Sequence, residues 1–203
     1  MQKQKQVTRE EILARIKEID LKFQSTETWL HPTLSKLARE RELLVALANK
    51  QDRGASGARK NGVASAKGSI IAFLDDDATA EREWLTYILN GHRDPNVLGV
   101  GGWLEPSWAG AEPGWFPAEF RWVVGCTYRG LPRQSGPVRN LIAANMSVRR
   151  DAFVALGGFR SGFGKIGKRL GCEETELCIR ALQQWPGKIW LYDPRARVHH
   201  KVP

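Results

Sequence analysis

The sequence predicts an α/β protein in which helices flank a mainly parallel sheet, preceded by an N-terminal helical hairpin. The first observation is a short apolar run, Ser69 to Leu74, that stops at three aspartates, as expected of a central strand buried on both faces. The second is that strand-like and helix-like segments alternate after this run, which favours parallel strands joined by helices. The third is a pair of amphipathic segments with helical periodicity in the first 50 residues.

The N-terminal hairpin is predicted from two segments, residues 9–23 and 33–48. Thr8 and Glu11 have the spacing of a capping box, and Ile12, Ile16 and Ile19 then recur every three or four residues. The second segment begins after a proline, as helices often do. We expect residues 1–50 to be a helical appendage that mediates homo-oligomer formation, with a linker at residues 50–54 and a second domain over 51–203.

The elements of the second domain follow from apolar runs and from the residues that interrupt them. Glycines at 99, 101 and 102 predict close backbone approach in one of the strands, and the Pro, Gly and Trp content of 105–134 predicts long loops. We expect helices at 57–66, 81–90, 151–155 and 173–184, and strands at 69–74, 97–103, 140–148, 188–191 and 196–199.

Composition and charge restrict the class of protein. The chain has 203 residues, of which 42% are hydrophobic and eight are tryptophan, so it is too apolar for a disordered protein. Its formal net charge of +9 predicts attraction to nucleotide diphosphates, to nucleic acid or to an anionic membrane face. The basic residues are scattered and match no recognised nucleic-acid motif, so we expect no nucleic-acid partner.

The cysteine content and the hydropathy of the sequence indicate the cellular compartment of the protein. The three cysteines, Cys126, Cys172 and Cys178, lie far apart, and an odd number without a secretory signal favours reduced thiols. The sequence shows no apolar stretch long enough to span a bilayer. We therefore expect a cytoplasmic protein, with a peripheral position at the inner membrane face as a further option.

Asp75, Asp76 and Asp77 follow the apolar run directly, where the carboxyl end of the predicted strand lies. Three adjacent carboxylates repel one another unless a cation or hydrogen-bond donors neutralise them. Mg²⁺ and Mn²⁺ prefer oxygen ligands and share their coordination between carboxylates and substrate phosphates. From these residues alone, a solvated turn or a helix cap is an equally good interpretation.

Two further groups of polar residues have a structural alternative. The acidic residues at 173, 174 and 176 begin a predicted helix, where negative charge stabilises the helix without any catalytic role. His199 and His200 lie near the end of the sequence, where histidines are more often exposed than bound to metal. The aromatic residues of 103–122 favour local packing over a stacking platform for a sugar or a lipid-linked acceptor.

Four sequence blocks in this order resemble family 2 glycosyltransferases, which have the GT-A fold. The first and most specific is Arg53-Gly-Ala-Ser-Gly-Ala-Arg-Lys-Asn-Gly-Val-Ala-Ser-Ala-Lys-Gly68 followed by Ile70-Ile-Ala-Phe-Leu-Asp-Asp-Asp77. The others are Asn145-Met-Ser-Val-Arg-Arg150 with Gly157-Gly-Phe159, Gly171-Cys-Glu-Glu-Thr-Glu-Leu177 and Tyr192-Asp-Pro-Arg-Ala-Arg-Val-His-His-Lys-Val-Pro203. The resemblance covers about 150 residues and implies a GT-A-like domain over 51–203.

The resemblance implies roles for particular residues. Asp77 is the implied metal ligand and Asp75 contacts both the metal and the nucleoside, with Asp76 as a second candidate for the nucleotide. His200 fits the metal-binding histidine better than His199 does. Asn145 and Arg59 are further implied contacts to the nucleotide sugar, although Lys60 stands where the family has asparagine after that arginine.

The implied activity is that of an inverting glycosyltransferase. Glu174, with Glu173 as a second candidate, is the general base that takes a proton from the acceptor hydroxyl. The donor is a nucleoside-diphosphate sugar, UDP- or GDP-linked, the cofactor is Mn²⁺ or Mg²⁺, and the acceptor is a carbohydrate or a lipid-linked molecule. The family normally begins with a strand-helix-strand unit that holds the base, where this chain has the predicted hairpin. The alternative is therefore an inactive glycosyltransferase remnant that acts as a binding or interaction module.

Overall fold

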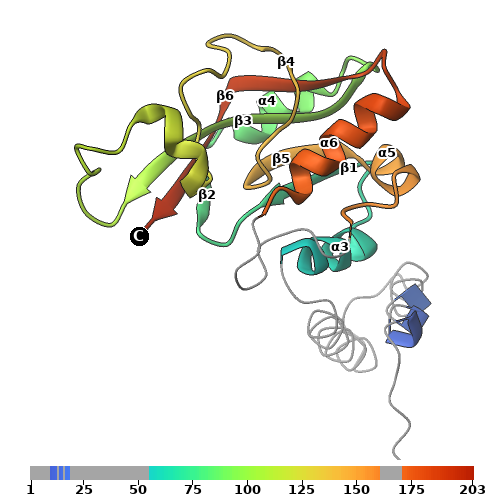
Figure 1. Cartoon of the computed structure of the whole chain (residues 1–203). Coiled ribbons are helices and arrows are strands. Elements are labelled where there is room, and N and C mark those ends of the chain that lie inside the picture. The colour runs from blue at the N-terminus through green and yellow to red at the C-terminus, as the bar shows by residue number, and fades with distance from the viewer. Residues whose placement is uncertain (1–9, 13, 16, 19–54, 161–170) are drawn as a thin grey trace, which may run out of the picture. The chain divides into compact units, whose positions relative to one another are not determined.

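Six strands form one mixed sheet, in the order β1–β5–β3–β6–β2 with β4 also paired to β6 (Figure 1). This computed structural model describes residues 10–12, 14–15, 17–18, 55–160 and 171–203. The chain divides into two compact units, residues 1–67 with 161–171 and residues 68–160 with 172–203. The sheet and the predicted metal ligands lie in the second unit.

The strand directions differ from the mainly parallel arrangement that the sequence suggests. β1 (Ile70–Leu74) and β3 (Val97–Trp108) both pair antiparallel with β5 (Asn145–Arg149), which lies between them. β6 (Ile189–Val202) pairs in parallel only with β3, and β2 (Ala78–Ala80) and β4 (Gly136–Val138) pair antiparallel with it. A parallel connection usually runs through a crossover α-helix, whereas residues 109–144 contain a short 3₁₀ helix and strand β4 but no α-helix before β5. The α/β fold class is confirmed, but only one of the five pairings is parallel.

β1 ends where the sequence predicts, with Asp75 directly after Leu74. Its side chains alternate: Ile71 and Phe73 are buried, whereas Leu74 is 42% exposed. In the described strand order β1 stands at the end of the sheet and pairs with β5. The expectation of a central strand buried on both faces is therefore wrong for the part of the chain that the structure describes.

The helices agree closely with the sequence expectations. α4 spans Trp84–Gly91, α5 Arg150–Ala155 and α6 Glu173–Gln184, and α3, in the first unit, spans Ala55–Ser65. The described residues of 10–18 are helical, as expected for the first hairpin helix. The predicted helix 33–48 and the linker at 50–54 lie outside the described residues. No helix in the described ranges is long and apolar enough to cross a membrane.

Two predicted segments are more regular than expected. β3 continues to Trp108, and a 3₁₀ helix, η1, forms at Ala118–Val124 within the expected loop region. The two short strands predicted at the end of the chain are one long strand, β6. The expected close approach at the β3 glycines is confirmed, because a Cβ at Gly102 would meet the Ala196 carbonyl oxygen.

The sheet core lies on the face of β6 that Val198 and Val202 line. Both side chains are buried in a cluster with Leu104 and Cys126. The alternate residues of β6 are exposed on the opposite face, namely Arg195, Arg197, His199 and Lys201. Alternation along this strand therefore decides which of the adjacent histidines faces the core side.

Candidate functional site

Asp75, Asp77 and His200 come together at one edge of the sheet. One ligand atom from each of these side chains lies within 4.8 Å of the others. The pairing of β2 with β6 brings these side chains together. Ala78 lies opposite His200, and the Lys201 amide donates to the Asp77 carbonyl oxygen at 3.0 Å. His200 Nε2 then lies 3.1 Å from Asp77 Oδ1. Asp76 is exposed and lies outside this group.

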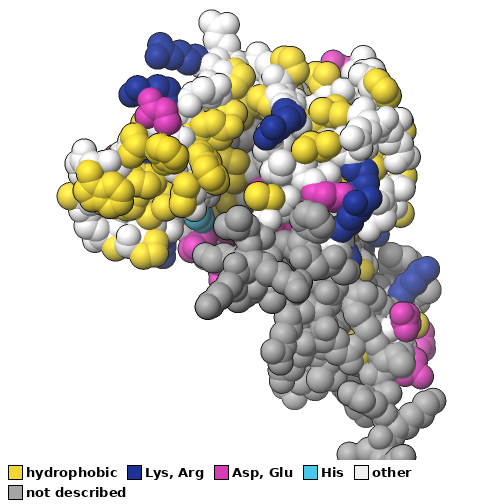
Figure 2. All heavy atoms as spheres, viewed as in Figure 1, with side chains coloured by type: hydrophobic (Ala, Val, Ile, Leu, Met, Phe, Trp, Pro, Cys, Tyr) yellow, Lys and Arg dark blue, Asp and Glu magenta, His cyan; other side chains and the backbone are white. Residues whose placement is uncertain are grey.

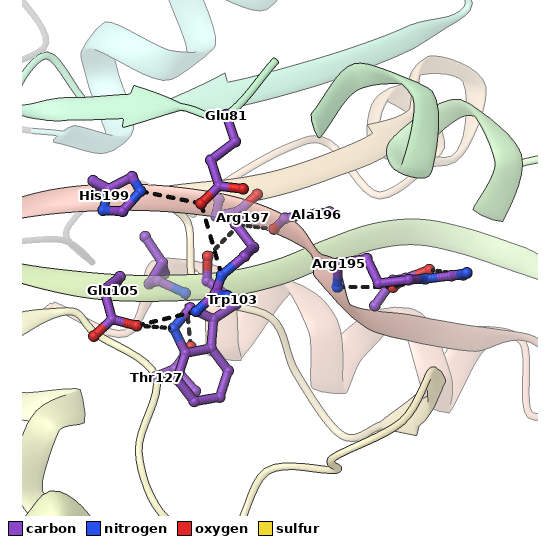
Figure 3. A network of polar contacts seen from close by, with 11 residues as sticks. Glu81, Trp103, Glu105, Thr127, Arg195, Ala196, Arg197 and His199 are labelled. Carbon is purple, nitrogen blue, oxygen red and sulfur yellow. Dashed lines mark hydrogen bonds and ion pairs between the residues drawn. The ribbon is translucent and has the colours of Figure 1, made fainter. Parts of the chain in front are cut away.

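His199 points to the opposite face of β6 and belongs to a separate surface network (Figure 3). Its Nε2 lies 3.1 Å from Glu81 Oε1, and Arg197 reaches both Glu81 and Glu105. The Arg197 guanidinium also lies over the Trp103 ring, 5.5 Å from its centre. The geometry therefore agrees with the preference for His200 over His199.

Cys126 contacts the His200 ring at Nδ1. Its Sγ lies 3.7 Å from His200 Nδ1, and its side chain is fully buried. Burial raises the pKa of the Cys126 thiol to about 12, so the thiol stays neutral near pH 7. Gly125 has a φ of 72° and lets the chain pass the ring, since a Cβ there would lie 3.2 Å from His200 Cε1. No local pattern in the sequence indicated this role for Cys126.

The three side chains fit a divalent metal ion. The group offers two carboxylate oxygens and one imidazole nitrogen. Mn²⁺ can bind all three atoms, whereas Mg²⁺ prefers the two carboxylate oxygens. Three protein ligands leave coordination positions for substrate phosphate oxygens. The other ring nitrogen of His200, Nδ1, lies beside Cys126 Sγ. A metal-binding histidine usually has a protein group at its second nitrogen.

Glu173 and Glu174 begin α6 and are not members of the Asp75–Asp77–His200 group. The Glu173 side chain is buried, at 3% exposure, whereas Glu174 is half-buried. Glu176 pairs with Arg180 and with Arg160, and its pKa is lowered, chiefly by the hydrogen bond from Arg180. Arg59 lies on α3, in the other unit.

The Gly157-Gly-Phe159 block fixes α6 to the sheet. Gly157 and Gly158 both have left-handed φ values, 72° and 69°, and Arg180 donates to the carbonyl oxygens of Leu156 and Gly158. Phe159 is fully buried, and its ring packs against two others, those of Phe73 on β1 and Phe153 on α5. The block therefore links the helix that begins at Glu173 to the strand that ends before Asp75.

Asn145 is a structural residue in this arrangement. Its side chain is 1% exposed, with Oδ1 accepting from Trp84 Nε1 at 2.8 Å. Its Nδ2 donates to the carbonyl oxygens of Trp103 and Ala196. These bonds join β5 to β3, β6 and α4, and they occupy the amide donors that a sugar or nucleotide would need. The implied contact of Asn145 to the nucleotide sugar stays a prediction.

The family relationship follows from the sequence match together with this fold and site. Residues 31–157 match the family model described as glycosyl transferase family 2, and the chain belongs to this family. The match begins at residue 31, ahead of the predicted helix 33–48. The protein is therefore a glycosyltransferase-family chain with the GT-A fold.

Two curated proteins are similar in sequence. The glucosyl-dolichyl phosphate glucuronosyltransferase of Haloferax volcanii is 37% identical over 161 residues, which cover 78% of this chain and 51% of that protein. The succinoglycan biosynthesis protein ExoM of Rhizobium meliloti is 30% identical over 138 residues, which cover 67% of this chain and 41% of that protein. The chain thus spans about half or less of the length of these relatives.

One solved structure shows the shared fold. GalNAc-T7, crystallised with UDP, GalNAc and Mn²⁺, is similar over 73% of this chain and 30% of its own, with a TM-score of 0.52 and 18% sequence identity. At this identity the likeness establishes the fold alone.

Proposed function

We propose that residues 51–203 form the transferase domain of an inverting, divalent-metal-dependent glycosyltransferase. The enzyme moves a sugar from a UDP- or GDP-linked donor to an acceptor hydroxyl. The observation that carries the proposal is the Asp75–Asp77–His200 group at the sheet edge of a family 2 chain. Residues 1–50 are the proposed helical appendage, through which copies of the chain associate as a homo-oligomer.

Asp75, Asp77 and His200 are the proposed ligands of Mn²⁺ or Mg²⁺. The bound ion would neutralise the diphosphate as it leaves the sugar. Asp75 also contacts the nucleoside, and Asp76 and Arg59 are further proposed contacts to the nucleotide. The exposure of Asp76 leaves its carboxylate accessible from solvent.

Glu174 is the proposed general base. It accepts the proton of the acceptor hydroxyl as the new bond forms at the anomeric carbon and the bond to the diphosphate breaks. Attack from the face opposite the leaving group inverts the anomeric configuration. Glu173 is the less suitable candidate because its side chain is buried, whereas Glu174 is half-buried.

The names of the relatives support two acceptor classes. The Haloferax protein is named for a dolichyl-phosphate-linked sugar, which is lipid-linked, and the Rhizobium protein for the biosynthesis of succinoglycan, a glycan. We therefore propose a carbohydrate or lipid-linked acceptor, with the enzyme in the cytoplasm or peripheral at the inner membrane face.

Calorimetric titration with UDP- and GDP-sugars, with and without Mn²⁺, tests the donor and the metal together. Donor binding is expected only with Mn²⁺, and Asp77→Asn should abolish Mn²⁺ binding because it removes a charged ligand. Asp76→Asn is the matched control: it removes the same charge one residue away and should leave the binding of Mn²⁺ alone nearly unchanged. Equal loss of Mn²⁺ affinity in both variants would contradict the assignment of Asp77.

Glu174→Gln tests the general base. The amide keeps the size of the side chain but cannot accept the proton, so transfer should fall by about a hundredfold or more while donor binding stays intact. Transfer at the original rate would rule out this role. If the folded chain binds no nucleotide sugar at all, the alternative of an inactive remnant that acts as a binding module is favoured instead.

A further inference from the structure

The pairing of β3 with β6 changes register just before the histidines of β6. Gly102 lies opposite Asp193, and in the next pair Leu104 lies opposite Val198. Between these two pairs β3 advances by two residues and β6 by five. The extra residues form a bulge at 194–197, which we call the β6 bulge. The position of the histidines along the sheet therefore depends on this bulge.

The β6 bulge also decides which face of the sheet a side chain of β6 occupies. Paired residues of neighbouring strands point to the same face, and the faces alternate with a period of two. The number of residues inserted on β6 is odd, so its even-numbered residues change faces at the bulge. Before the bulge, Trp190 donates through Nε1 to a carbonyl oxygen of α6, whereas within it Ala196 packs with Ile88 of α4. The bulge therefore decides that His200, and not His199, lies beside the aspartates.

Side chains satisfy the backbone groups that the β6 bulge takes out of the strand ladder. Such groups need other partners when they are buried. Thr127 Oγ1 accepts from the Leu104 amide on β3 at 2.8 Å. Asp193 Oδ1 accepts from the Arg195 amide on β6 at 3.0 Å. Each of these two side chains serves a single strand.

The Asn145 amide serves both strands at the bulge. Its Nδ2 donates to the carbonyl oxygens of Ala196, at 2.8 Å, and Trp103, at 3.1 Å, two residues that Figure 3 labels. Its Oδ1 accepts from Trp84 Nε1, and because an indole N–H can only donate, this bond fixes which side of the amide faces the carbonyls. The Asn145 side chain is 1% exposed, where an unpaired polar group is costly. Asn145 therefore holds the bulge between β3 and β6.

The backbone of Asn145 reaches the other half of the predicted metal site. Asn145 lies opposite Leu74 on β1, and Leu74 directly precedes Asp75. The site itself lies at the surface, since Figure 2 shows a histidine and acidic side chains together where Figure 1 places β2 and the end of β6. Asn145 is buried below this surface, so it acts on the site through the strands that it joins.

We propose that Asn145 is a positioning residue for the metal site, which it orients by holding the β6 bulge in one register. In this register Ala78 lies opposite His200, and His200 Nε2 lies beside Asp77. Without the amide, two carbonyl oxygens lose their donors and the bulge can shift along β3, which moves His200 away from Asp77. The effect on metal rests on the proposed metal ligands, whereas the hold of Asn145 on the bulge does not.

Asn145→Ala tests both steps in the full chain. In EDTA, hydrogen–deuterium exchange at the amides of 198–202 should become faster by about fivefold or more, because the register of this segment is no longer fixed. Calorimetric titration of Mn²⁺ alone should give an affinity about tenfold lower, as when a group that orients a metal ligand is lost. Asn145→Ser, which keeps one donor, should show smaller changes of the same kind and replaces Asn145→Ala if that variant does not fold.

Ser147→Ala is the matched control. Ser147 lies on the same strand, is also fully buried, and donates through Oγ to the Val100 carbonyl oxygen at 2.8 Å, ahead of the bulge. Its loss should destabilise the fold without a selective change in exchange at 198–202 or in Mn²⁺ affinity. Unchanged exchange in Asn145→Ala, or equal effects in both variants, would overturn the proposal.

Two further outcomes separate this proposal from the proposed function. Unchanged Mn²⁺ affinity with weaker donor binding in Asn145→Ala would overturn the positioning role in favour of a direct contact between Asn145 and the nucleotide sugar. If the original chain binds no Mn²⁺, the metal assignment fails, and the exchange measurement in EDTA still decides whether Asn145 holds the bulge.

Discussion

The His200 side chain shows how single residues prepare the predicted metal site. Alternation along β6 turns it toward the core face, and Gly125 and Cys126 pack against its ring. Its Nε2 is left beside Asp77, at 3.1 Å. A histidine that binds metal through one nitrogen is oriented by whatever the other nitrogen contacts. Cys126 should therefore affect metal affinity although it is not a ligand.

Substitution of Cys126 by alanine should weaken Mn²⁺ binding by about tenfold, because the His200 ring loses its orienting contact. The measurement is calorimetric titration of Mn²⁺. Cys178→Ala is the control, since Cys178 is also fully buried but belongs to α6. It should cost a similar free energy of unfolding, about 1 kcal/mol, without changing the affinity. Unchanged Mn²⁺ affinity in Cys126→Ala would contradict the positioning role.

His92 makes the stability of the second unit depend on pH. Burial, and then the positive charge of Arg149, lower the pKa of His92 to about 4. Its Nε2 lies 2.9 Å from Ser147 Oγ, and its Nδ1 is buried without a hydrogen-bond partner. The folded chain therefore holds this imidazole neutral, whereas the unfolded chain protonates it below a pH of about 6.5.

The free energy of unfolding should consequently fall as the pH drops from about 6.5 to about 4, by at most about 3 kcal/mol from His92. The sign follows because the unfolded chain binds a proton in this window that the folded chain does not. Urea unfolding across this window measures the slope, and His92→Gln should flatten it. His199→Gln, which changes an exposed histidine, should not. The same slope in both variants would exclude His92 as its source.

At the scale of elements, the turn at Gly157 and Gly158, after α5, positions α6, the helix that carries the proposed base Glu174. Gly157 and Gly158 take left-handed backbone conformations that side chains disfavour. Arg180 on α6 satisfies two carbonyl oxygens of this turn, and Phe159 packs beside Phe73 on β1. One turn therefore couples three elements.

The two glycines of this turn should differ in their tolerance of alanine. At Gly157 a Cβ meets nothing within 4 Å, so Gly157→Ala should cost only the backbone term of about 1–2 kcal/mol. At Gly158 a Cβ would lie 2.9 Å from Phe153 Cε1, so Gly158→Ala must also displace this ring and should destabilise the fold further. Chemical unfolding of both variants measures the difference. An equal loss of unfolding free energy in both variants would show that the Phe153 ring can move aside at no energetic cost.

At the scale of the whole molecule, the predicted metal would join distant parts of the chain. Asp75 and Asp77 lie in the connection between β1 and β2, whereas His200 lies near the end of β6. A ligand that binds only the folded chain stabilises it in proportion to the logarithm of its concentration. Metal binding should therefore be visible as stability as well as activity.

Mn²⁺ should raise the midpoint of thermal unfolding, with a gain of about 2.7 kcal/mol at a free concentration of about a hundred times the dissociation constant. EDTA should reverse the rise, and Asp77→Asn should show none. Differential scanning calorimetry is the measurement. A rise of the same size in Asp77→Asn would place the bound ion elsewhere.

Local sequence patterns were sufficient for several elements. β1 ends before Asp75, and α6 runs over the predicted residues because its acidic first turn and its apolar period lie within one segment. Strand direction was not predictable in this way, because it depends on where the chain returns after a long connection. The antiparallel position of β5 between β1 and β3 was therefore missed by the sequence prediction.

The family membership, the α/β class and the order of most helices and strands follow from the sequence, because they depend on neighbouring residues and on motifs of fixed spacing. Which side chains meet was decided by tertiary contacts. The family resemblance favoured His200 over His199, but only the structure shows that the His200 side chain lies beside Asp75 and Asp77 and that the Asn145 amide forms hydrogen bonds between strands. The physical reason is that register and alternation bring together atoms more than a hundred residues apart, and no local pattern encodes such a meeting.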